Sequence, residues 1–278
     1  MRNRIIVAAV ALAVLCAAAA ALAGPRDAAI NVTRLGGDSA AAQPYITKFL
    51  RYLESEAGWP AGSGKGSFLL TRKEALSYIE SAKPGFGMID PPLYFEIRTS
   101  AQLQPILQVE SKDLYSERLH VVVKDPAFKT LADLKGKRLW STIAEYPRYL
   151  SKVVLGGQVD AASHFELKQI GQALKGVRAV LRGDCDATLL DDEQLAKAKE
   201  IAGGGGLRTV YSSPVLPPIP VVVFGATYPA ADREALVKAF KAMCGTSEGG
   251  AICKEMHIQK IVPFNSAAFG DAQKRYGE

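Results

Sequence analysis

The stretch LHVVVKDPAFKTLADLKGKRLW, residues 119–140, decides the fold of this chain. Its β-branched run from His120 to Val123 predicts a strand. Thr130, with Asp133 three places further on, predicts the capped start of a one-turn helix. Gly136 predicts the end of that helix, because glycine readily takes the left-handed conformation after a last turn. Extended structure then resumes, so a strand, a short helix and a second strand follow one another closely.

The N-terminus predicts export. Arg2 and Arg4 precede an apolar run from Ile5 to Ala23, which ends in the small-residue pattern Ala-Leu-Ala. This is typical of a cleaved secretory signal peptide over residues 1–23 and predicts that the protein is exported. The alternative is an uncleaved membrane anchor, because the run approaches the roughly 20 residues that span a bilayer. A lipoprotein signal is disfavoured, since Cys16 lies in the middle of the run.

The length and bulk composition favour two domains of ordinary size. Without residues 1–23 the chain has 255 residues, which is enough for two ordinary domains. Its net charge falls from +6 to +4, and the Lys and Arg residues are scattered without a dense block. We therefore expect no nucleic-acid partner. The mild positive charge is compatible with a small anionic ligand.

Three cysteines follow the signal region, and their spacing carries no CxxC metal or redox motif. Cys244 and Cys253 flank a Gly-rich turn after an apolar helical pattern, which predicts a disulfide in an oxidising compartment. Cys185 lies between Asp184 and Asp186, whose charges should raise its pKa. We interpret Cys185 as structural and unreactive.

The first strand and helix suggest an anion site. Ala29–Leu35 predicts a strand, and a Gly-rich turn ending in Ser39 leads into a helix over Ala40–Glu56. Backbone N–H groups at such a helix start can hold an anion, so Ser39 is a candidate ligand-binding residue. The alternative is an ordinary turn between strand and helix.

Helices and strands alternate along the rest of the chain. Thr71 and Glu74 predict a capping box for a helix ending near Ala82, and Phe86–Ile89 predicts a buried strand, as in an α/β lobe with a parallel sheet. From residue 140 onward, the strand or loop candidates are Trp140–Ile143, Gln158–Ala161, Gly183–Leu190 and Leu207–Ser212. Helices are expected near Pro147–Leu155, Ile170–Leu181 and Asp191–Ala202. Asp191 and Asp192 are interpreted as caps of the last of these helices.

The chain is predicted to cross twice between two lobes. The first crossing lies near residue 118, and the apolar run Pro217–Phe224 predicts the second near 218. Ala231–Met243 and the tail Ile252–Gly277 then complete the first lobe with helices. The expected domains are therefore 24–118 with 219–278 for lobe 1, and 119–218 for lobe 2, inserted in the first.

Four segments together resemble one known family. They are PPLYFE at 91–96, the stretch 119–140, AVLRGDCDATLLD at 179–191 and VYSSPVLPPIPVVVF at 210–224. They resemble the periplasmic substrate-binding proteins of phosphate, phosphite and phosphonate ABC transporters, which have the type II binding-protein fold. The resemblance implies two α/β lobes with a ligand cleft between the carboxyl ends of both sheets, which closes about a hinge.

The resemblance also implies candidate ligand-binding residues. Tyr94 matches the family's cleft tyrosine, although packing beneath the hinge is an alternative, and Asp186 matches an aspartate near the cleft. The family's Ser-Thr-Ser-Gly anion loop is replaced here by Tyr-Pro-Arg-Tyr at 146–149, so its hydroxyl cradle is missing. Tyr146 and Arg148 are the remaining candidates, because an arginine can bind an oxyanion with two hydrogen bonds. A surface role for Arg148 is the alternative.

These observations predict an exported solute-binding protein of an ABC transporter that captures a small anionic, phosphate- or phosphonate-like ligand and delivers it to a permease. We expect a monomer without a cofactor. The three histidines are not at metal-binding spacing, and no GxSxG nucleophile motif is present, so neither a metal site nor catalysis is expected. The alternatives are a degenerate binding-protein fold acting as a sensory or protein-interaction module, or an enzyme on the same fold.

Overall fold

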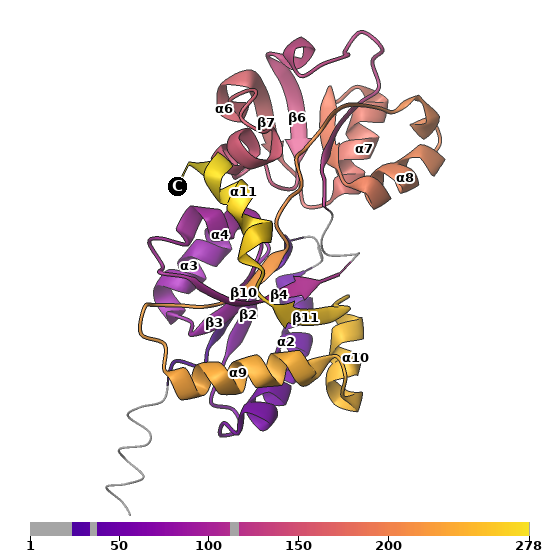
Figure 1. Ribbon diagram of the computed structural model, residues 1–278. Coiled ribbons are helices and arrows are strands. Elements are labelled where there is room, and N and C mark those ends of the chain that lie inside the picture. The colour runs from indigo at the N-terminus through magenta and orange to yellow at the C-terminus, as the bar shows by residue number, and fades with distance from the viewer. Residues whose placement is uncertain (1–23, 34–37, 112–116, 278) are drawn as a thin grey trace, which may run out of the picture.

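The computed structural model describes residues 24–33, 38–111 and 117–277, which form two α/β lobes (Figure 1). The predicted signal peptide, residues 1–23, lies outside the described residues. Each lobe is built around its own β-sheet, and the second sheet is formed by a continuous middle part of the chain. The predicted two-lobe fold, with the second lobe inserted in the first, is confirmed.

The first lobe contains a six-stranded sheet in the order β11-β4-β10-β3-β1-β2. Its strands are β1 Ala28–Asn31, β2 Gly66–Phe68, β3 Phe86–Ile89, β4 Gln104–Glu110, β10 Ile219–Val223 and β11 Lys260–Pro263. β1 is parallel to β2 and β3, whereas β10 runs antiparallel to both β3 and β4. The three parallel strands therefore present their carboxyl ends at one edge of the sheet.

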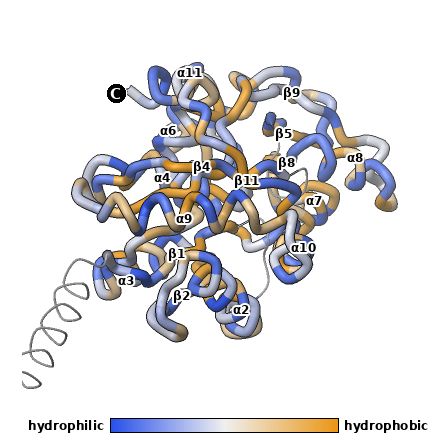
Figure 2. Tube along the Cα trace, turned by 60° about the horizontal axis from the view of Figure 1, so that its bottom comes forward, coloured by the Kyte–Doolittle hydropathy of each residue, from blue (hydrophilic) through white to orange (hydrophobic). Residues whose placement is uncertain are grey.

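Helices cover this sheet because their apolar residues recur on one side. They are α2 Ser39–Ala57, α3 Arg72–Ala82, α4 Pro91–Ile97, α9 Ala230–Met243 and α10 Ser247–Glu255. In Figure 2, α2 and α9 alternate between hydrophilic and hydrophobic colours, as expected for helices with one buried face. Phe49 of α2, Phe86 of β3 and Phe240 of α9 are fully buried and pack ring to ring. The predicted capping box of Thr71 and Glu74 is confirmed at the start of α3.

The second lobe contains a five-stranded sheet in the order β7-β6-β8-β5-β9. Its strands are β5 His120–Val123, β6 Lys137–Ser141, β7 Phe165–Gln169, β8 Ala187–Leu190 and β9 Arg208–Ser212. Its helices are the 3₁₀ turn η2 Ala132–Leu134, α5 Pro147–Tyr149, the π-helix η3 Leu150–Val154, α6 Ala161–His164, α7 Ala173–Arg182, α8 Asp192–Glu200 and the 3₁₀ turn η4 Gly204–Gly206. β6 is parallel to β7 and β8, so their carboxyl ends also lie together.

The stretch 119–140 folds as predicted in outline. β5 and β6 are the two strands, and Gly136 takes the left-handed conformation with φ +71°. The short helix is the 3₁₀ turn η2, and its start differs from the expected capping box. The Asp133 carboxylate accepts the Thr130 backbone N–H and the Thr130 hydroxyl, each near 3 Å, so Thr130 acts as a donor.

The sequence-based assignment missed two features. The edge strand β7 was not predicted, because one of its faces is exposed and carries charged residues that obscure the apolar pattern. Gln158–Ala161, a strand or loop candidate, is a loop that leads into α6. The tail also contains β11 and ends in α11, Ser266–Tyr276, which contacts η3 of the second lobe. Figure 1 shows this C-terminal helix lying between α4 and the second lobe. The tail therefore connects the lobes instead of only completing the first.

The cysteines lie as the sequence indicates. Cys244 and Cys253 form a disulfide between the end of α9 and α10. Cys185 is buried, and this burial, followed by the charge of Asp186, raises its pKa to about 12. Such a thiol stays protonated near neutral pH and is a poor nucleophile.

Candidate functional site: the cavity between the lobes

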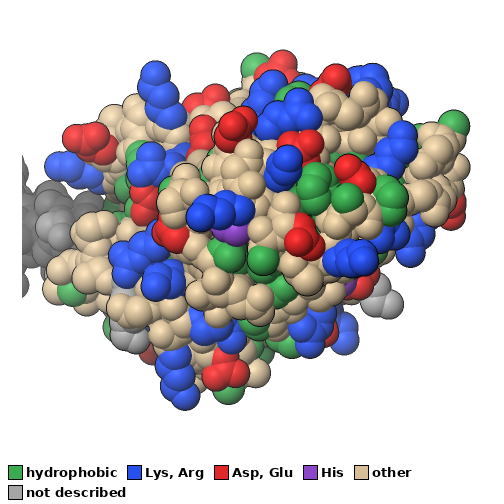
Figure 3. Space-filling view, turned by 90° about the horizontal axis from the view of Figure 1, so that it is seen from above, with side chains coloured by type: hydrophobic (Ala, Val, Ile, Leu, Met, Phe, Trp, Pro, Cys, Tyr) green, Lys and Arg blue, Asp and Glu red, His purple; other side chains and the backbone are tan. Residues whose placement is uncertain are grey.

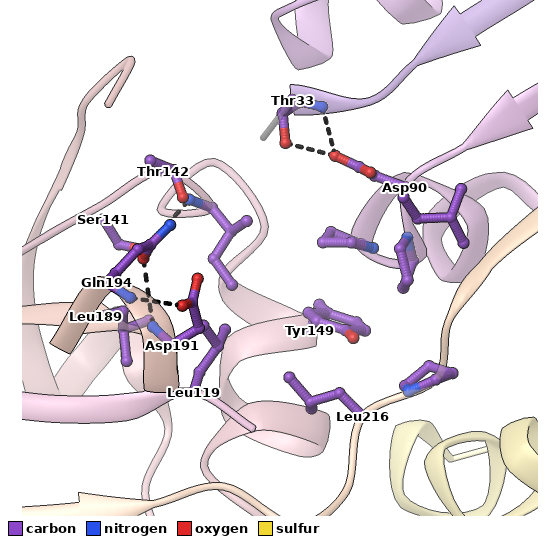
Figure 4. Close-up of a pocket in the computed structure, with 15 residues that line it drawn as sticks. Thr33, Asp90, Leu119, Ser141, Thr142, Tyr149, Leu189, Asp191, Gln194 and Leu216 are labelled. Atoms are coloured by element: carbon purple, nitrogen blue, oxygen red, sulfur yellow. Dashed lines mark hydrogen bonds between the residues drawn. The ribbon is translucent and has the colours of Figure 1, made fainter. Parts of the chain in front are cut away.

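A cavity of about 90 Å³ lies where the carboxyl ends of the two sheets face each other (Figure 4). Thr33 and Asp90 line it after β1 and β3, and Ser141 and Asp191 line it at the ends of β6 and β8. Leu119, Leu216 and Pro217 come from the segments that connect the lobes. The cavity thus has walls from both lobes and from the connecting segments, at the location expected for a ligand in open α/β folds.

Asp90 is the charged group of the first wall. It occupies the N-cap position of α4 and is 8 % exposed. Its Oδ2 atom accepts the backbone N–H of Thr33 at 2.7 Å and also the Thr33 hydroxyl. Pro91 and Pro92 follow at the first two helical positions and have no backbone N–H to offer. The Asp90 carboxylate therefore joins the ends of β1 and β3 and faces the cavity.

Asp191 is the charged group of the opposite wall. It is 1 % exposed and caps α8, where its Oδ1 accepts the Gln194 backbone N–H at 2.8 Å. The Gln194 side chain in turn accepts the Asp191 backbone N–H at 3.2 Å. The predicted capping role of Asp191 is confirmed, and Asp192 is the first residue of the helix. Figure 4 shows Asp90 and Asp191 on facing walls.

The cavity is acidic in the part of the chain that the structure describes. Asp90 and Asp191 line it, and among residues 24–33, 38–111 and 117–277 no Lys, Arg or His does so. The hydroxyl of the buried Ser141 accepts the Ile143 backbone N–H at 3.2 Å, and Tyr149 and Leu216 add apolar surface. The Thr142 hydroxyl and the Gln194 side-chain amide also line the cavity, so the wall combines two carboxylates with neutral hydrogen-bonding groups.

The structure does not bring the five predicted ligand-binding residues together. Ser39, Tyr94, Tyr146, Arg148 and Asp186 are all absent from the described lining of the cavity. Ser39 is the first residue of α2, and Asp38 satisfies the start of that helix by accepting the Ala40 backbone N–H at 2.8 Å.

Tyr94 and Arg148 have packing roles. Tyr94 is 2 % exposed, and its ring lies 5.3 Å from that of Phe95 and 5.7 Å from that of Phe269. Burial raises its pKa. Arg148 donates to the backbone carbonyl of Tyr276 at 3.1 Å, and its guanidinium carbon lies 4.4 Å from the centroid of the Tyr276 ring. These contacts agree with the packing alternative for Tyr94, and those of Arg148 hold α11 against the second lobe. A ligand-binding role of either residue stays a prediction.

Asp186 lies at the opposite end of β8 from the cavity wall. Arg138 donates to it through the backbone N–H at 2.8 Å, through Nε at 3.0 Å and through Nη2 at 3.1 Å. The side-chain hydrogen bonds from Arg138 are the main reason that the pKa of Asp186 is lowered. Asp186 is thus a structural partner of β6, and its role at a ligand site stays a prediction.

Tyr146 is the exception among the candidates. Its side chain is buried, and no described protein group lies within hydrogen-bond distance of its hydroxyl. Burial raises its pKa strongly, and the charges of Asp90, Glu96 and Glu145 add to this. The charge of Asp90 therefore acts on a hydroxyl that has no hydrogen-bond partner among the described residues.

Sequence reasoning missed one polar group beside the lobe connection. His120 contacts Ser212 Oγ through Nδ1 at 2.8 Å and Asp192 Oδ1 through Nε2 at 2.9 Å. These residues are 92 and 72 positions from His120, so no spacing could have revealed them. None of the three lines the cavity. His120 therefore links β5 to β9 through Ser212 and to the start of α8 through Asp192.

Within the described ranges, no cluster of three or more His, Cys, Asp or Glu side chains could hold a metal ion. None of the described helices has both the length and the apolar character to cross a bilayer. Figure 3 shows Lys and Arg intermixed with Asp and Glu over the visible face, without a large area of one sign.

Two α/β lobes, one inserted in the other, with a cavity between the carboxyl ends of their sheets define a two-lobe solute-binding fold. Residues 39–269 match the family described as "ABC transporter, phosphonate, periplasmic substrate-binding protein". The chain belongs to this family of periplasmic substrate-binding proteins. No curated protein is detectably similar to the chain in sequence.

Solved structures share the fold at low sequence identity. A Xanthomonas citri protein bound to chloride ion has a TM-score of 0.68 and 14% identity, over 90% of this chain and 96% of its own. PhnD1 from Prochlorococcus marinus, in complex with methylphosphonate, has a TM-score of 0.62 and 13% identity, over 91% and 95%. A binding-protein component of an ABC phosphonate transporter from Pseudomonas aeruginosa has a TM-score of 0.62 and 14% identity, over 88% and 83%. At these identities the similarity supports the fold.

Proposed function

We propose that this chain is the exported solute-binding component of an ABC transporter and captures a small ligand between its lobes by hinge closure. The observation that carries this proposal is the cavity, whose walls come from the carboxyl ends of both sheets. A ligand that contacts both walls stabilises the closed arrangement, because it binds that arrangement better than the open one. The closed form would then be recognised by a permease.

Export and domain boundaries belong to the same proposal. The positively charged start and apolar run of residues 1–23 support a cleaved signal peptide, and the Cys244–Cys253 disulfide suits the oxidising periplasm. We keep lobe boundaries of 24–118 with 219–278, and 119–218, because β5 to β9 all belong to the second sheet and β10 to the first. We propose that the protein acts as a monomer and without catalysis.

The proposal also covers the chemical class of the ligand. Family membership and the net charge of +4 without the signal region support the phosphate- or phosphonate-like anion predicted from the sequence. The absence of the family's hydroxyl cradle at 146–149 favours a sensory or protein-interaction module as the second candidate function.

Thermal unfolding of the protein without residues 1–23 tests solute binding. The ligands are phosphate, phosphite, methylphosphonate, sulfate, carboxylates, amino acids and small amines, each added separately. A ligand at 100 times its Kd adds about 2.7 kcal/mol, which raises the Tm by roughly 5 to 10 °C for a chain of this size. Small-angle X-ray scattering should show a smaller radius of gyration with the same ligand. If no compound shifts the Tm, solute capture is contradicted and the interaction module is favoured.

A further inference from the structure

We propose that removal of the signal peptide creates an ion pair between the new α-ammonium group of Gly24 and the carboxylate of Asp232, which fixes the start of the processed chain to the first lobe. The inference goes beyond solute capture, and it rests on the export part of the proposed function. Three observations carry it: the contact made by the Gly24 nitrogen, the close packing around Gly24, and the position of the predicted cleavage.

The carboxylate of Asp232 holds the backbone nitrogen of Gly24. Its Oδ2 atom accepts the Gly24 N–H at 2.6 Å, and its Oδ1 atom accepts the Trp59 indole N–H at 3.0 Å. Asp232 lies in the first turn of α9, and its side chain is only 14 % exposed. A poorly exposed carboxylate is therefore already directed at the atom that becomes the first atom of the processed chain.

The surroundings of Gly24 fit only a glycine without rearrangement. A Cβ atom on this residue would lie 2.8 Å from Pro229 Cδ and 3.2 Å from Tyr228 Cε2. Three residues further on, the Asp27 carbonyl accepts the Gly85 backbone N–H at 2.8 Å. These contacts do not involve the Gly24 nitrogen, so they hold that nitrogen beside Asp232 both before and after cleavage.

The predicted cleavage breaks the bond directly before this nitrogen. Ala21 and Ala23 supply the small residues of a signal-peptidase site, so the bond to be hydrolysed joins Ala23 to Gly24. Water supplies a hydroxyl group to the Ala23 carbonyl carbon and a hydrogen to the Gly24 nitrogen. At neutral pH the new carboxyl group loses its proton and the new amine gains one, since the usual pKa of an α-amine is about 8. A neutral amide with one N–H thus becomes an ammonium with three.

The cleavage therefore converts a neutral hydrogen bond into a charge-assisted one. Bonds of the second kind are shorter and roughly twice as strong. Arg26 is the other cation near this carboxylate, but its Nη2 lies 4.0 Å from Oδ1, farther than the Gly24 nitrogen lies from Oδ2. The Arg26 guanidinium carbon instead lies 5.2 Å from the centroid of the Trp59 ring. The first lobe then reaches its full stability only after the signal peptide has been removed.

The experiment compares two chains that differ in where they begin. One begins at Gly24 and the other at Ala21, and both are released from a cleavable fusion partner so that no initiator methionine remains. In the longer chain the Gly24 nitrogen is again a neutral amide, and the terminal charge lies three residues away. We expect the Tm of the chain that begins at Gly24 to be higher by about 3 °C or more. Mass spectrometry of the protein exported from the full chain should give Gly24 as its first residue.

Asp232→Asn tests whether the difference in Tm comes from the ion pair. Asparagine keeps an oxygen acceptor for the Trp59 N–H but has no charge, so the two chain lengths should then differ by less than about 1 °C. Glu234→Gln is the matched control, because it removes a carboxylate from an exposed position of the same helix. In this control the difference in Tm should persist.

A second measurement needs no variant, and it applies equally if Asp232→Asn does not fold. At pH 7, acetic anhydride should acylate the terminal amine of the folded chain that begins at Gly24 at least tenfold more slowly than the terminal amine of the folded chain that begins at Ala21. An amine that is protonated and held by a carboxylate is a poor nucleophile. Equal rates of acylation would contradict the ion pair.

The remaining outcomes separate this inference from the proposed function. Equal Tm values of the two chains, or a difference that survives Asp232→Asn, would overturn the ion pair and leave export and solute capture standing. An exported protein whose first residue is not Gly24 would overturn the ion pair through its cleavage point. A protein that retains residues 1–23 would contradict export as well. Solute capture is tested separately, by the effect of ligands on the Tm of the chain that begins at Gly24.

Discussion

The boundary between the lobes has two halves that are built differently. One half is the acidic cavity, and the other is an aromatic cluster made of Tyr94, Phe95, Tyr149, Phe269 and Tyr276. Rings of this cluster come from the first lobe, the second lobe and α11, with centroids 5.3 to 6.5 Å from the Phe95 ring. The aromatic half is filled by the chain itself, whereas the cavity half leaves space between walls that carry Asp90 and Asp191.

This difference separates stability from recognition. Buried aromatic contacts stabilise the arrangement of lobes and C-terminal helix whether or not a ligand is bound. Buried carboxylates instead make the cavity half sensitive to the charge of what enters it. Tyr149 belongs to both halves, because it packs against Phe95 and also lines the cavity. Its ring is the physical link through which ligand binding can affect the packing of α11.

Phe95→Ala should have the largest effect, and it acts on the aromatic half. Phe95 is 1 % exposed and contacts four other rings, so we expect a loss of about 3 to 5 kcal/mol in the free energy of unfolding, measured in urea. Val215→Ala, at a side chain that is 51 % exposed, is the control and should change stability by less than about 0.5 kcal/mol. A loss below about 1 kcal/mol for Phe95→Ala would refute the view that this cluster stabilises the boundary.

The sequence predicted the elements that have strong local signals. β5 and β3 match their predicted ranges because β-branched and apolar runs mark buried strands, and the Thr71 capping box marked the start of α3. β7 was missed because an edge strand with one exposed face lacks such a run. The packing partner of α11 could not be predicted, because an amphipathic pattern indicates that one face is buried but not which lobe covers that face.

The sequence predicted the location of the site but not the residues that line it. A cavity at the carboxyl ends of both sheets follows from the fold, which the stretch 119–140 already indicated. Its lining residues depend on tertiary contacts, and family resemblance directed attention to Tyr94 and Arg148, which this chain uses for packing. Asp191 was interpreted correctly as a cap, but nothing in its local sequence showed that it would face Asp90 across the cavity.

Asp186→Asn tests whether the carboxylate that is paired with Arg138 contributes to stability, in contrast to the carboxylates that line the cavity. We expect a loss of about 1 to 2 kcal/mol at pH 7, because the bonds from Arg138 lose the charged acceptor. The pKa of Asp186 is lowered in the folded protein, so this stability is present above the unfolded pKa of about 3.9 and is lost as the pH falls through the folded pKa. Urea unfolding from pH 7 to pH 3 should show the two proteins converging below about pH 4. A constant difference down to pH 3 would contradict this assignment.

Tyr146→Phe should have the smallest effect on stability, and it tests the place where the two halves meet. Because the hydroxyl is buried without a described protein partner, its removal should leave the free energy of unfolding unchanged or raise it by up to about 1 kcal/mol. Tyr149→Phe is the matched comparison, since it removes a hydroxyl from a ring that lines the cavity.

Calorimetry of the Tyr146→Phe variant, with a ligand found by thermal unfolding, then tests whether the Tyr146 hydroxyl contacts the ligand. An unchanged affinity places it in the aromatic half, whereas a loss of tenfold or more means that its hydroxyl reaches the ligand beside Asp90. A destabilisation of more than about 1 kcal/mol without ligand would show that the hydroxyl has a stabilising partner in solution.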